Sequence, residues 1–413
     1  MDPEKAKQWR PAPVVQQYNT RDAIIYALGI GCNVKEDLHF LYEAHQDFQV
    51  FPTFVVKPGL TSVSLDGTPG IAYDLQRILH GEQYIEILNP IPEDGEFRTE
   101  CEVVDILDKG SAAVILTNVT TYDNKTNKKL SFQQMATFQV GSGKFGGPRT
   151  NPREKKALPV PQRKPDRVVE VQTTKDQAAL YRYGSGDMNP LHIDPDFAKA
   201  SGFPTPILHG LCSLGVSTKA VIKEYGGNDG HNLKAVKVRF SAPVIPGQTL
   251  VVEMWKEGNR IHFQTKAKES GKTVIANAYV DLLDVKPAQP SETTEELVSD
   301  AIFEQINEQL PNQKDIIKKI NGVVLYDITK NGKHAAYYTL DLKNGPVGKA
   351  FKGQSSDKPI VTVTVDDQDF LKIVTGGLGG MKAFMTGKLK AKGNVIVLQK
   401  LQGVLSGATK SKL

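Results

Sequence analysis

A chain of 413 residues is too long for one compact core, and its composition, 39% hydrophobic and 23% charged, excludes a disordered or fibrous protein. The net charge of +5 is spread along the chain without a basic stripe interleaved with aromatic residues, so we expect no nucleic-acid partner. No apolar run approaches the roughly 18 residues that a membrane span needs. Three isolated cysteines (Cys32, Cys101 and Cys212) predict free, mostly buried thiols.

Two proline-rich stretches divide the chain. The first runs from residue 141 to about residue 166 and the second from 285 to 294, and both have the composition of linkers. We therefore predict an N-terminal half over residues 1–150, a second half over 151–285, a linker at 286–294 and a further unit over 295–410.

The two halves have similar patterns. Leu79-His80-Gly81 in the first half echoes Leu208-His209-Gly210 in the second, and each is followed by segments that alternate apolar and polar residues, such as 112–116 and 249–254. Each half is therefore predicted to hold a helical stretch followed by antiparallel strands. An internal duplication would pack two similar α+β units side by side.

Asp187 and His192 stand five residues apart in the second half, with Asn189-Pro190 between them. This pair predicts a turn and excludes a helix across the gap, so a carboxylate and an imidazole can face one point. A helix follows, with Asp194 as its N-cap and an end near residue 202. A second, apolar helix is expected from about residue 210 to residue 225, where two glycines end it.

The segment after residue 290 predicts an independent α+β module. Thr293-x-x-Glu296 matches a capping box, and apolar residues from 298 to 310 recur every four positions on one helical face. A short helix at 316–320, a hairpin turn at Asn331-Gly332, and a strand at 359–365 followed by a helix complete the module. The final Ser411-Lys412-Leu413 matches the peroxisomal address, which predicts a peroxisomal location and an import receptor as a partner.

The residues around Asp187 suit the addition of water to an α,β-unsaturated thioester. Asp187 and His192 can hold the water and pass its proton, and the N–H of Gly210, at the positive end of a helix, can stabilise charge on the thioester oxygen. Nucleophilic catalysis is less favoured, because no Ser or Cys stands beside a His–acid pair in an elbow motif.

The sequences 181–195 and 206–212 closely resemble the hydratase 2 motif of MaoC-like, hot-dog-fold enzymes, and the resemblance covers nearly all of residues 15–285. It implies a double hot-dog fold of the α+β class in which residues 1–150 form a degenerate half and 151–285 the catalytic half. The implied activity is hydration of trans-2-enoyl-CoA to (3R)-3-hydroxyacyl-CoA in peroxisomal fatty-acid β-oxidation. A homodimer is implied as well.

The resemblance also implies roles for single residues. Asp187 and His192 would be the catalytic dyad, Asn189 would orient the water, and Gly210 would be the oxyanion donor. Glu43, in Leu41-Tyr42-Glu43, matches a glutamate that the family requires, although a structural glutamate would look the same in sequence. The first half would supply a tunnel for the acyl chain.

Two further residues beside the motif are candidates for substrate binding. Arg182 is a candidate contact for the CoA phosphates, and a solvated surface arginine explains the residue as well. His209 is expected to shape the helix start rather than to transfer protons.

We expect no cofactor beyond the CoA of the substrate. No metal is expected, because His192-Ile193-Asp194 has no third ligand at a typical spacing. Residues 141–146 match G-x-G-x-x-G, but Pro148 and Pro152 prevent the helix that dinucleotide binding requires. The (3R)-hydroxyacyl-CoA dehydrogenase that would use the product is therefore expected on a separate polypeptide, unless the chain is a fragment or a naturally shortened form.

The last unit resembles sterol carrier protein 2 over residues 351–353, 361–365 and 382–394, which implies an apolar tunnel for a lipid or acyl-CoA. Two alternatives remain. The protein could be a lipid-transfer protein with an inert hot-dog portion, or an acyl-CoA thioesterase. An intact Asp187–His192 pair argues against the first, and a thioesterase would not need the Asp-x-Asn-Pro-x-His arrangement.

Overall fold

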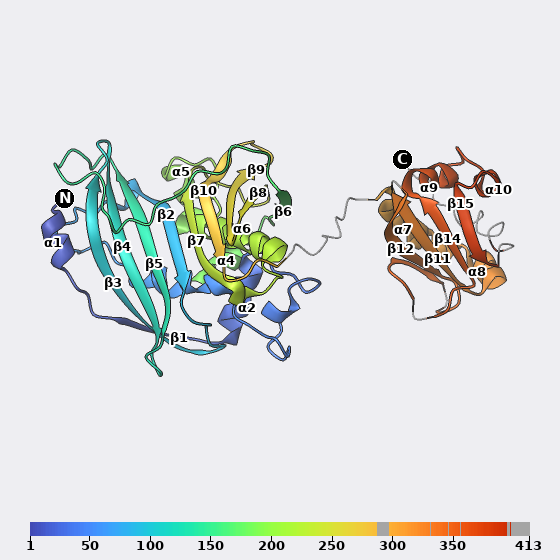
Figure 1. The fold of residues 1–413 in the computed structure, drawn as a ribbon, viewed down its shortest axis with the longest axis horizontal. Coiled ribbons are helices and arrows are strands. Elements are labelled where there is room, and N and C mark those ends of the chain that lie inside the picture. The colour runs from blue at the N-terminus through green and yellow to red at the C-terminus, as the bar shows by residue number, and fades with distance from the viewer. Residues whose placement is uncertain (287–296, 331, 346, 356, 395–396, 398–413) are drawn as a thin grey trace. The chain divides into compact units, whose positions relative to one another are not determined.

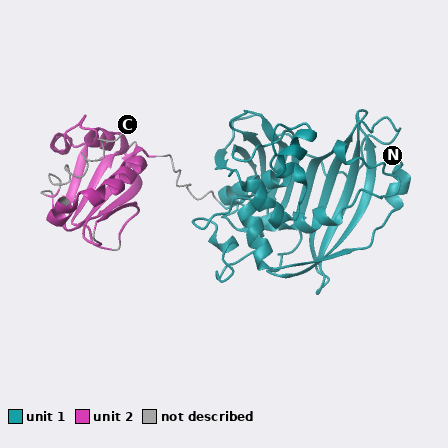
Figure 2. Cartoon of the chain, turned by 180° about the vertical axis from the view of Figure 1, so that it is seen from behind, with its two compact units in different colours: residues 1–290 teal, residues 291–413 magenta. Residues whose placement is uncertain are grey.

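The computed structural model describes residues 1–286 and 297–397, except 331, 346, 356, 395 and 396. The chain divides into two compact units, residues 1–290 and 291–413 (Figure 2). Several expected features lie outside the described residues: most of the linker, the Thr293–Glu296 capping box, Asn331 and the 411–413 tripeptide. Within the described ranges, no helix is long and apolar enough to cross a membrane.

Unit 1 is built on one ten-stranded antiparallel sheet (Figure 1). The strand order is β1-β3-β4-β5-β2-β7-β10-β9-β8-β6. In the first half the strands are β1 (Val14–Tyr18), β2 (Ile78–Ile87), β3 (Gly95–Asp108), β4 (Ala112–Asp123) and β5 (Lys129–Val140). In the second half they are β6 (Arg167–Gln172), β7 (Leu233–Phe240), β8 (Thr249–Glu257), β9 (Arg260–Ala267) and β10 (Thr273–Leu282).

The strand order confirms the predicted double hot-dog architecture. Read outward from the centre, the first half runs β2-β5-β4-β3-β1 and the second runs β7-β10-β9-β8-β6, so each strand has a counterpart five places later in the chain. The halves join where β2 pairs with β7, from Glu82 opposite Arg239 to Glu86 opposite Ala235. The two halves therefore share one continuous sheet.

The helices differ between the halves more than the strands do. The first half has α1 (Pro3–Gln8), α2 (Thr20–Gly29) and the seven-residue α3 (Val56–Ser62), with 3-10 turns η1 (Leu38–Phe40), η2 (Pro52–Val55) and η3 (Leu75–Arg77). The second half has α4 (Gln177–Ser185), η4 (Pro190–His192), α5 (Pro195–Ala200), α6 (Gly210–Tyr225) and η5 (Gly230–Asn232). Helix α6 packs against β7, β8 and β10, and all its residues except Gly210 and Lys223 are buried.

Two glycines let helices α2 and α4 approach closely. A Cβ at Gly29 would lie 2.9 Å from Cα of Tyr181, and a Cβ at Gly184 would lie 2.5 Å from Cα of Tyr26. Only residues without a side chain fit at such backbone distances. Because Gly184 lies three residues before Asp187, this packing fixes the segment that carries the predicted chemistry.

The expected equivalence of the two Leu-His-Gly motifs is wrong. Leu208-His209-Gly210 opens helix α6, whereas Leu79-His80-Gly81 lies inside strand β2. The β2–β5 register shifts between His80 and Glu82, and a Cβ at Gly81 would lie 2.2 Å from the ring of Phe138. Gly81 is thus a bulge glycine required by a neighbouring ring, and not a helix start.

Unit 2 is a five-stranded sheet with helices, as predicted. Its strands are β11 (Val323–Lys330), β12 (Lys333–Asp341), β13 (Lys349–Lys352), β14 (Val361–Asp366) and β15 (Leu389–Gly393), in the order β13-β12-β11-β14-β15. Its helices are α7 (Val298–Gln309), α8 (Lys314–Ile320), α9 (Asp367–Val374) and α10 (Gly380–Met385), with η6 (Leu310–Asn312). Strands β11 and β14 are parallel, and the other pairs are antiparallel.

The core of unit 2 is aromatic. The ring of Phe303 stacks on Tyr338 at 4.4 Å and on Phe370 at 5.4 Å between centroids. The buried carboxylate of Asp367 accepts hydrogen bonds from the N–H groups of Val298 (3.0 Å) and Ser299 (2.9 Å) at the start of α7. This carboxylate from a distant helix satisfies two of the N–H groups that a helix start leaves free. The three cysteines of the chain are free thiols, and Cys32 and Cys212 are buried, as expected.

Candidate active site

The position of Asp187 is set by Gly186, a residue in the left-handed conformation that ends helix α4. Helix α4 ends at Ser185, and Gly186 follows with φ +76°, its N–H bonded to the carbonyl of Arg182 at 3.0 Å. The N–H of Asp187 then donates to Oγ of Ser185 at 3.2 Å. The carboxylate itself accepts the N–H of Asn189 at 3.1 Å, which holds it at the start of the next turn. Asp187 is therefore oriented by its own backbone surroundings.

The predicted turn between the dyad residues is present. Oδ1 of Asn189 accepts the N–H of Leu191 at 3.0 Å and caps η4. The Asn189 Nδ2 group donates to no residue that the structure describes. The expected helix after it also forms, because Oδ1 of Asp194 accepts the N–H groups of Asp196 (2.8 Å) and Phe197 (3.2 Å).

His192 is held in one tautomer. Its Nδ1 lies 2.8 Å from the carbonyl oxygen of Ile207, which can only accept, so Nδ1 carries the proton and Nε2 carries the lone pair. Burial lowers the pKa of His192, and the Ile207 carbonyl and the charge of Asp187 oppose this effect. The ring is thus neutral near pH 7, and its Nε2 can accept a proton.

His209, named in the sequence analysis as a substrate-binding candidate that shapes the helix start, lies against the two dyad residues. It is the residue before α6, it is 1% exposed, and its ring stacks on His192 with centroids 3.7 Å apart. Its Nε2 lies 3.4 Å from the main-chain oxygen of Asp187. Burial lowers the pKa of His209 to about 2, so this ring transfers no proton near neutral pH.

Gly210 stands at the start of the sixteen-residue helix α6, at the edge of this cluster. Within the described ranges its N–H donates to no group, and the helix dipole adds positive charge there. A Cβ at this position would lie 3.2 Å from the ring of Phe240, which covers the residue. The N–H is therefore free to bind an oxyanion, the role that the sequence predicts for it.

His80 of the first half packs against Phe240, the residue that lies beside Gly210. Burial lowers the pKa of His80 on β2, and the charge of nearby Asp187 opposes that lowering. The His80 ring meets the ring of Phe240 edge-on at 5.4 Å, and its Nε2 lies 3.0 Å from Oε1 of Gln83. The Leu-His-Gly motif was visible in the sequence, but its position against Phe240, which lies at Gly210, depends on the pairing of β2 with β7.

Two predicted site residues stay predictions. Glu43 lies exposed in the turn after η1, where it forms no hydrogen bond or ion pair with any described residue. Arg182 lies on α4, one turn before Gly186, with its guanidinium 5.3 Å from the ring centroid of Tyr183. Neither position contradicts the expected role, and neither tests it.

The G-x-G-x-x-G segment forms no helix, and its N–H groups donate hydrogen bonds to the carboxylate of Asp108. Asp108 accepts hydrogen bonds from the N–H groups of Gly110 (2.9 Å), Lys144 (2.9 Å) and Gly146 (3.0 Å). These bonds lower the pKa of Asp108 and keep it ionised. A phosphate would meet a negative charge where the motif normally presents free N–H groups.

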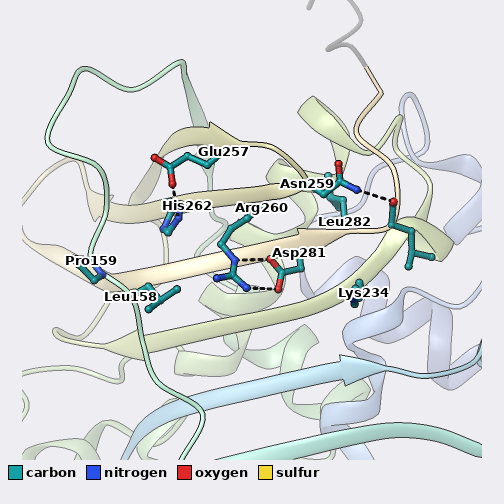
Figure 3. Close-up of a pocket in the computed structure, with 10 residues that line it drawn as sticks. Leu158, Pro159, Lys234, Glu257, Asn259, Arg260, His262, Asp281 and Leu282 are labelled. Carbon is teal, nitrogen blue, oxygen red and sulfur yellow. Dashed lines mark hydrogen bonds and ion pairs between the residues drawn. The ribbon is translucent and has the colours of Figure 1, made fainter.

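A cavity of about 770 Å³ lies elsewhere on unit 1, between residues 158–159 and strands β9 and β10 (Figure 3). Arg260 holds Asp281 through two hydrogen bonds of 2.6 and 2.7 Å, and Nε2 of His262 lies 3.4 Å from Glu257 (Figure 3). None of the dyad, His209 or Gly210 lines this cavity. Its charged groups are largely paired with each other, so we assign it no chemistry.

Comparison with protein families agrees with these units. Residues 16–141 match the MFE-2 hydratase 2 N-terminal domain, residues 156–278 match the MaoC like domain, and residues 303–406 match the SCP-2 sterol transfer family. The solved MaoC-like dehydratase from Phytophthora capsici is 34% identical, with a TM-score of 0.62, over 68% of this chain and 98% of that one. The chain belongs to the MaoC-like hydratase 2 family.

Two curated relatives place it more narrowly. The peroxisomal enoyl-CoA hydratase 2 of Arabidopsis thaliana is 43% identical over 64% of this chain and 90% of its own length. The peroxisomal multifunctional enzyme type 2 of Mus musculus is 46% identical over 95% of this chain and 54% of its own length. The chain thus spans about half the length of the mouse protein, and it shares with that protein both the hydratase 2 halves and the SCP-2 unit.

Proposed function

We propose that unit 1 hydrates trans-2-enoyl-CoA thioesters to (3R)-3-hydroxyacyl-CoA. The observation that carries the proposal is that polar side-chain atoms of Asp187, His192 and His209 lie within 4.8 Å of one another, with the free N–H of Gly210 directly after His209 at the start of α6. The Arabidopsis relative, named an enoyl-CoA hydratase, is matched over most of its length, which supports the same activity here.

In the proposed reaction, Asp187 and His192 hold the attacking water. Nε2 of His192 accepts a proton from the water as its oxygen adds to the β-carbon, and the pair supplies the proton that the α-carbon receives. The product gains one OH and one H, and both residues end in their starting states. The N–H of Gly210 stabilises the negative charge that develops on the thioester oxygen between these steps.

The surroundings of the dyad support a site shared between the halves. His80 on β2 meets the ring of Phe240, which lies against Gly210, while the first half has only the short α3 where the second half has α6. We propose that the acyl chain passes on this side. The names of the mouse and Arabidopsis relatives place those proteins in the peroxisome, and that location is part of the proposal for this chain. Unit 2 would bind a lipid or acyl-CoA.

A spectroscopic assay tests the activity. The full chain is incubated with a trans-2-enoyl-CoA, and the loss of conjugated thioester absorbance is followed while the product is analysed on a chiral column. Asp187→Asn and His192→Gln are each expected to lower kcat by at least about 100-fold, the range of general acid–base catalysis. A matched control is Asp194→Asn, which keeps the N-cap of α5 and touches neither dyad residue.

The same assay separates the alternatives. Release of free CoA in place of a hydroxyacyl-CoA would identify a thioesterase. An inert hot-dog portion with only the SCP-2 unit active would leave the absorbance unchanged while the chain still moves lipid between vesicles. Dyad variants that hydrate as fast as the parent would refute the residue assignment.

A further inference from the structure

Three metal-ligating side chains meet in the proposed active site. Asp187, His192 and His209 each offer a ligand atom, and these atoms lie within 4.8 Å of one another. We propose that the three residues bind a divalent transition-metal ion of the zinc class, which blocks the catalytic pair reversibly. The sequence analysis considered His192 with Asp194 and found no third ligand at a typical spacing. The structure instead places His209, at the start of α6, beside Asp187 and His192, although it lies seventeen residues after His192 in the chain.

The ligand types fit such an ion. Two imidazoles and one carboxylate form a ligand set that zinc and its neighbours bind in proteins, with one position left for water or another ligand. Metal bonds of about 2.1 Å require ligand atoms no further apart than about 4.2 Å. In a tetrahedral site the ligand atoms lie about 3.4 Å apart, so the three side chains need to close by up to about 1.4 Å, through rotation of the Asp187 carboxylate and the two rings.

The hydrogen bonds of the two rings also fit. His192 Nδ1 lies 2.8 Å from the Ile207 carbonyl, and His209 Nε2 lies 3.4 Å from the Asp187 carbonyl, so each ring has one nitrogen against a backbone oxygen. A metal-bound histidine almost always donates its second N–H in this way. The other nitrogen of each ring then carries a bare lone pair, and Nδ1 of His209 is buried without a hydrogen-bond partner among the residues that the structure describes. A bound cation would satisfy it.

Charge and access favour a cation as the occupant. Asp187 forms no ion pair with any described residue, so its carboxylate is available to a cation. The turn beside it is open to solvent, since Met188 is 48% exposed and Ile193 is 41% exposed. An ion on these ligands would take the lone pair of His192 and the carboxylate that the proposed hydration needs. Metal binding and hydration therefore exclude each other.

Binding is tested on the full chain without substrate. Zn²⁺ is titrated by calorimetry, and Co²⁺ is followed by its visible absorption, which reports imidazole ligation directly. One site is expected in the parent, and His209→Asn is expected to weaken it by at least about tenfold, as even loss of an outer-shell partner does. The matched control is His231→Asn. His231 Nδ1 lies 3.4 Å from Asp229 in an exposed His–Asp pair without a third ligand, so its loss should leave binding unchanged.

Asp187→Asn serves as a second variant should His209→Asn fail to fold, because it removes the charged ligand and keeps the side-chain shape. A parent without a stoichiometric site, or variants at residues 187 and 209 that bind like the parent, would overturn the inference. Inhibition of hydration by Zn²⁺, competitive with enoyl-CoA and reversed by a chelator, is expected as well, and this part rests on the proposed function. A chain that binds Zn²⁺ but hydrates no enoyl-CoA would refute that function and leave the metal site standing.

Discussion

A buried ion pair lies on the seam between the two halves of unit 1. Lys237 on β7 has a side chain 2% exposed, and its Nζ lies 2.8 Å from Oε2 of Glu82 on β2, whose side chain is 13% exposed. Glu82→Gln keeps the size of the partner and leaves the ammonium without its counter-charge. Removing one partner of a buried pair costs about 3–5 kcal/mol. We expect the free energy of unfolding of unit 1 to fall by that amount.

Urea unfolding followed by tryptophan fluorescence measures this change. The chain has two tryptophans, Trp9 and Trp255, and both lie in unit 1, so the signal reports that unit alone. The matched control is Glu170→Gln, which breaks a 2.6 Å pair with Lys268 whose side chains are 49% and 56% exposed. Such an exposed pair contributes less than about 1 kcal/mol.

The pH dependence identifies the cause. Burial lowers the pKa of Lys237, and Glu82 opposes that lowering. Between the lowered pKa and the ordinary value of 10.5, the unfolded state binds more protons than the folded state, so stability rises with pH. Without Glu82 the pKa is lowered further, and the deficit of Glu82→Gln should shrink as the pH is raised toward 10.5. A loss no larger than that of the control, or a deficit independent of pH, would refute the reasoning.

Three further results are expected. Gly184→Ala puts a Cβ 2.5 Å from Cα of Tyr26 and should lower the free energy of unfolding by about 1–3 kcal/mol, measured in urea. The hydration rate should fall as well, because Asp187 shifts. An unchanged rate would contradict the link between helix packing and the site. Neutral His192 is the form that can accept a proton, and burial lowers its pKa. We therefore expect kcat/KM for hydration to fall as the pH is lowered, with the midpoint of the fall below pH 6.5. A midpoint above pH 6.5 would exclude His192 as the base. Asp367→Ala frees two N–H groups at the start of α7 and should lower the stability of unit 2 by about 1–3 kcal/mol. Calorimetry should show this as a lower melting temperature of unit 2, while the transition of unit 1 stays in place.

Local patterns in the sequence were sufficient where short-range chemistry decides the structure. Asn189-Pro190 predicted a turn, and the structure has one because the Asn189 side chain caps the next three residues. Asp194 predicted a helix start, and α5 begins at Pro195 with both expected bonds. Helix α6 runs over the predicted residues 210–225 for the same reason, since a glycine pair ends it.

The contacts between the halves could not be predicted in this way. His80 meets Phe240 beside the start of α6 only because β2 pairs with β7, and that pairing joins strands about 150 residues apart, for which no local pattern exists. The same limit explains the failed equivalence of the two Leu-His-Gly motifs. The sequence Leu-His-Gly looks the same whether its glycine starts a helix or lies in a β-bulge. Only the packing of the Phe138 ring against Gly81 distinguishes the two cases.

The retention of the first half, although it has no Asp-x-Asn-Pro-x-His, follows from the sheet. Strand β7 is hydrogen-bonded on one side to β10 and on the other to β2, so a second half alone would expose β7 as a long edge strand. It would also lose the partner of the buried Lys237 and the close contact of α2 with α4 that positions Asp187. The first half therefore stabilises the second half, which carries Asp187 and His192. These contacts are a physical reason for the second half to retain its partner.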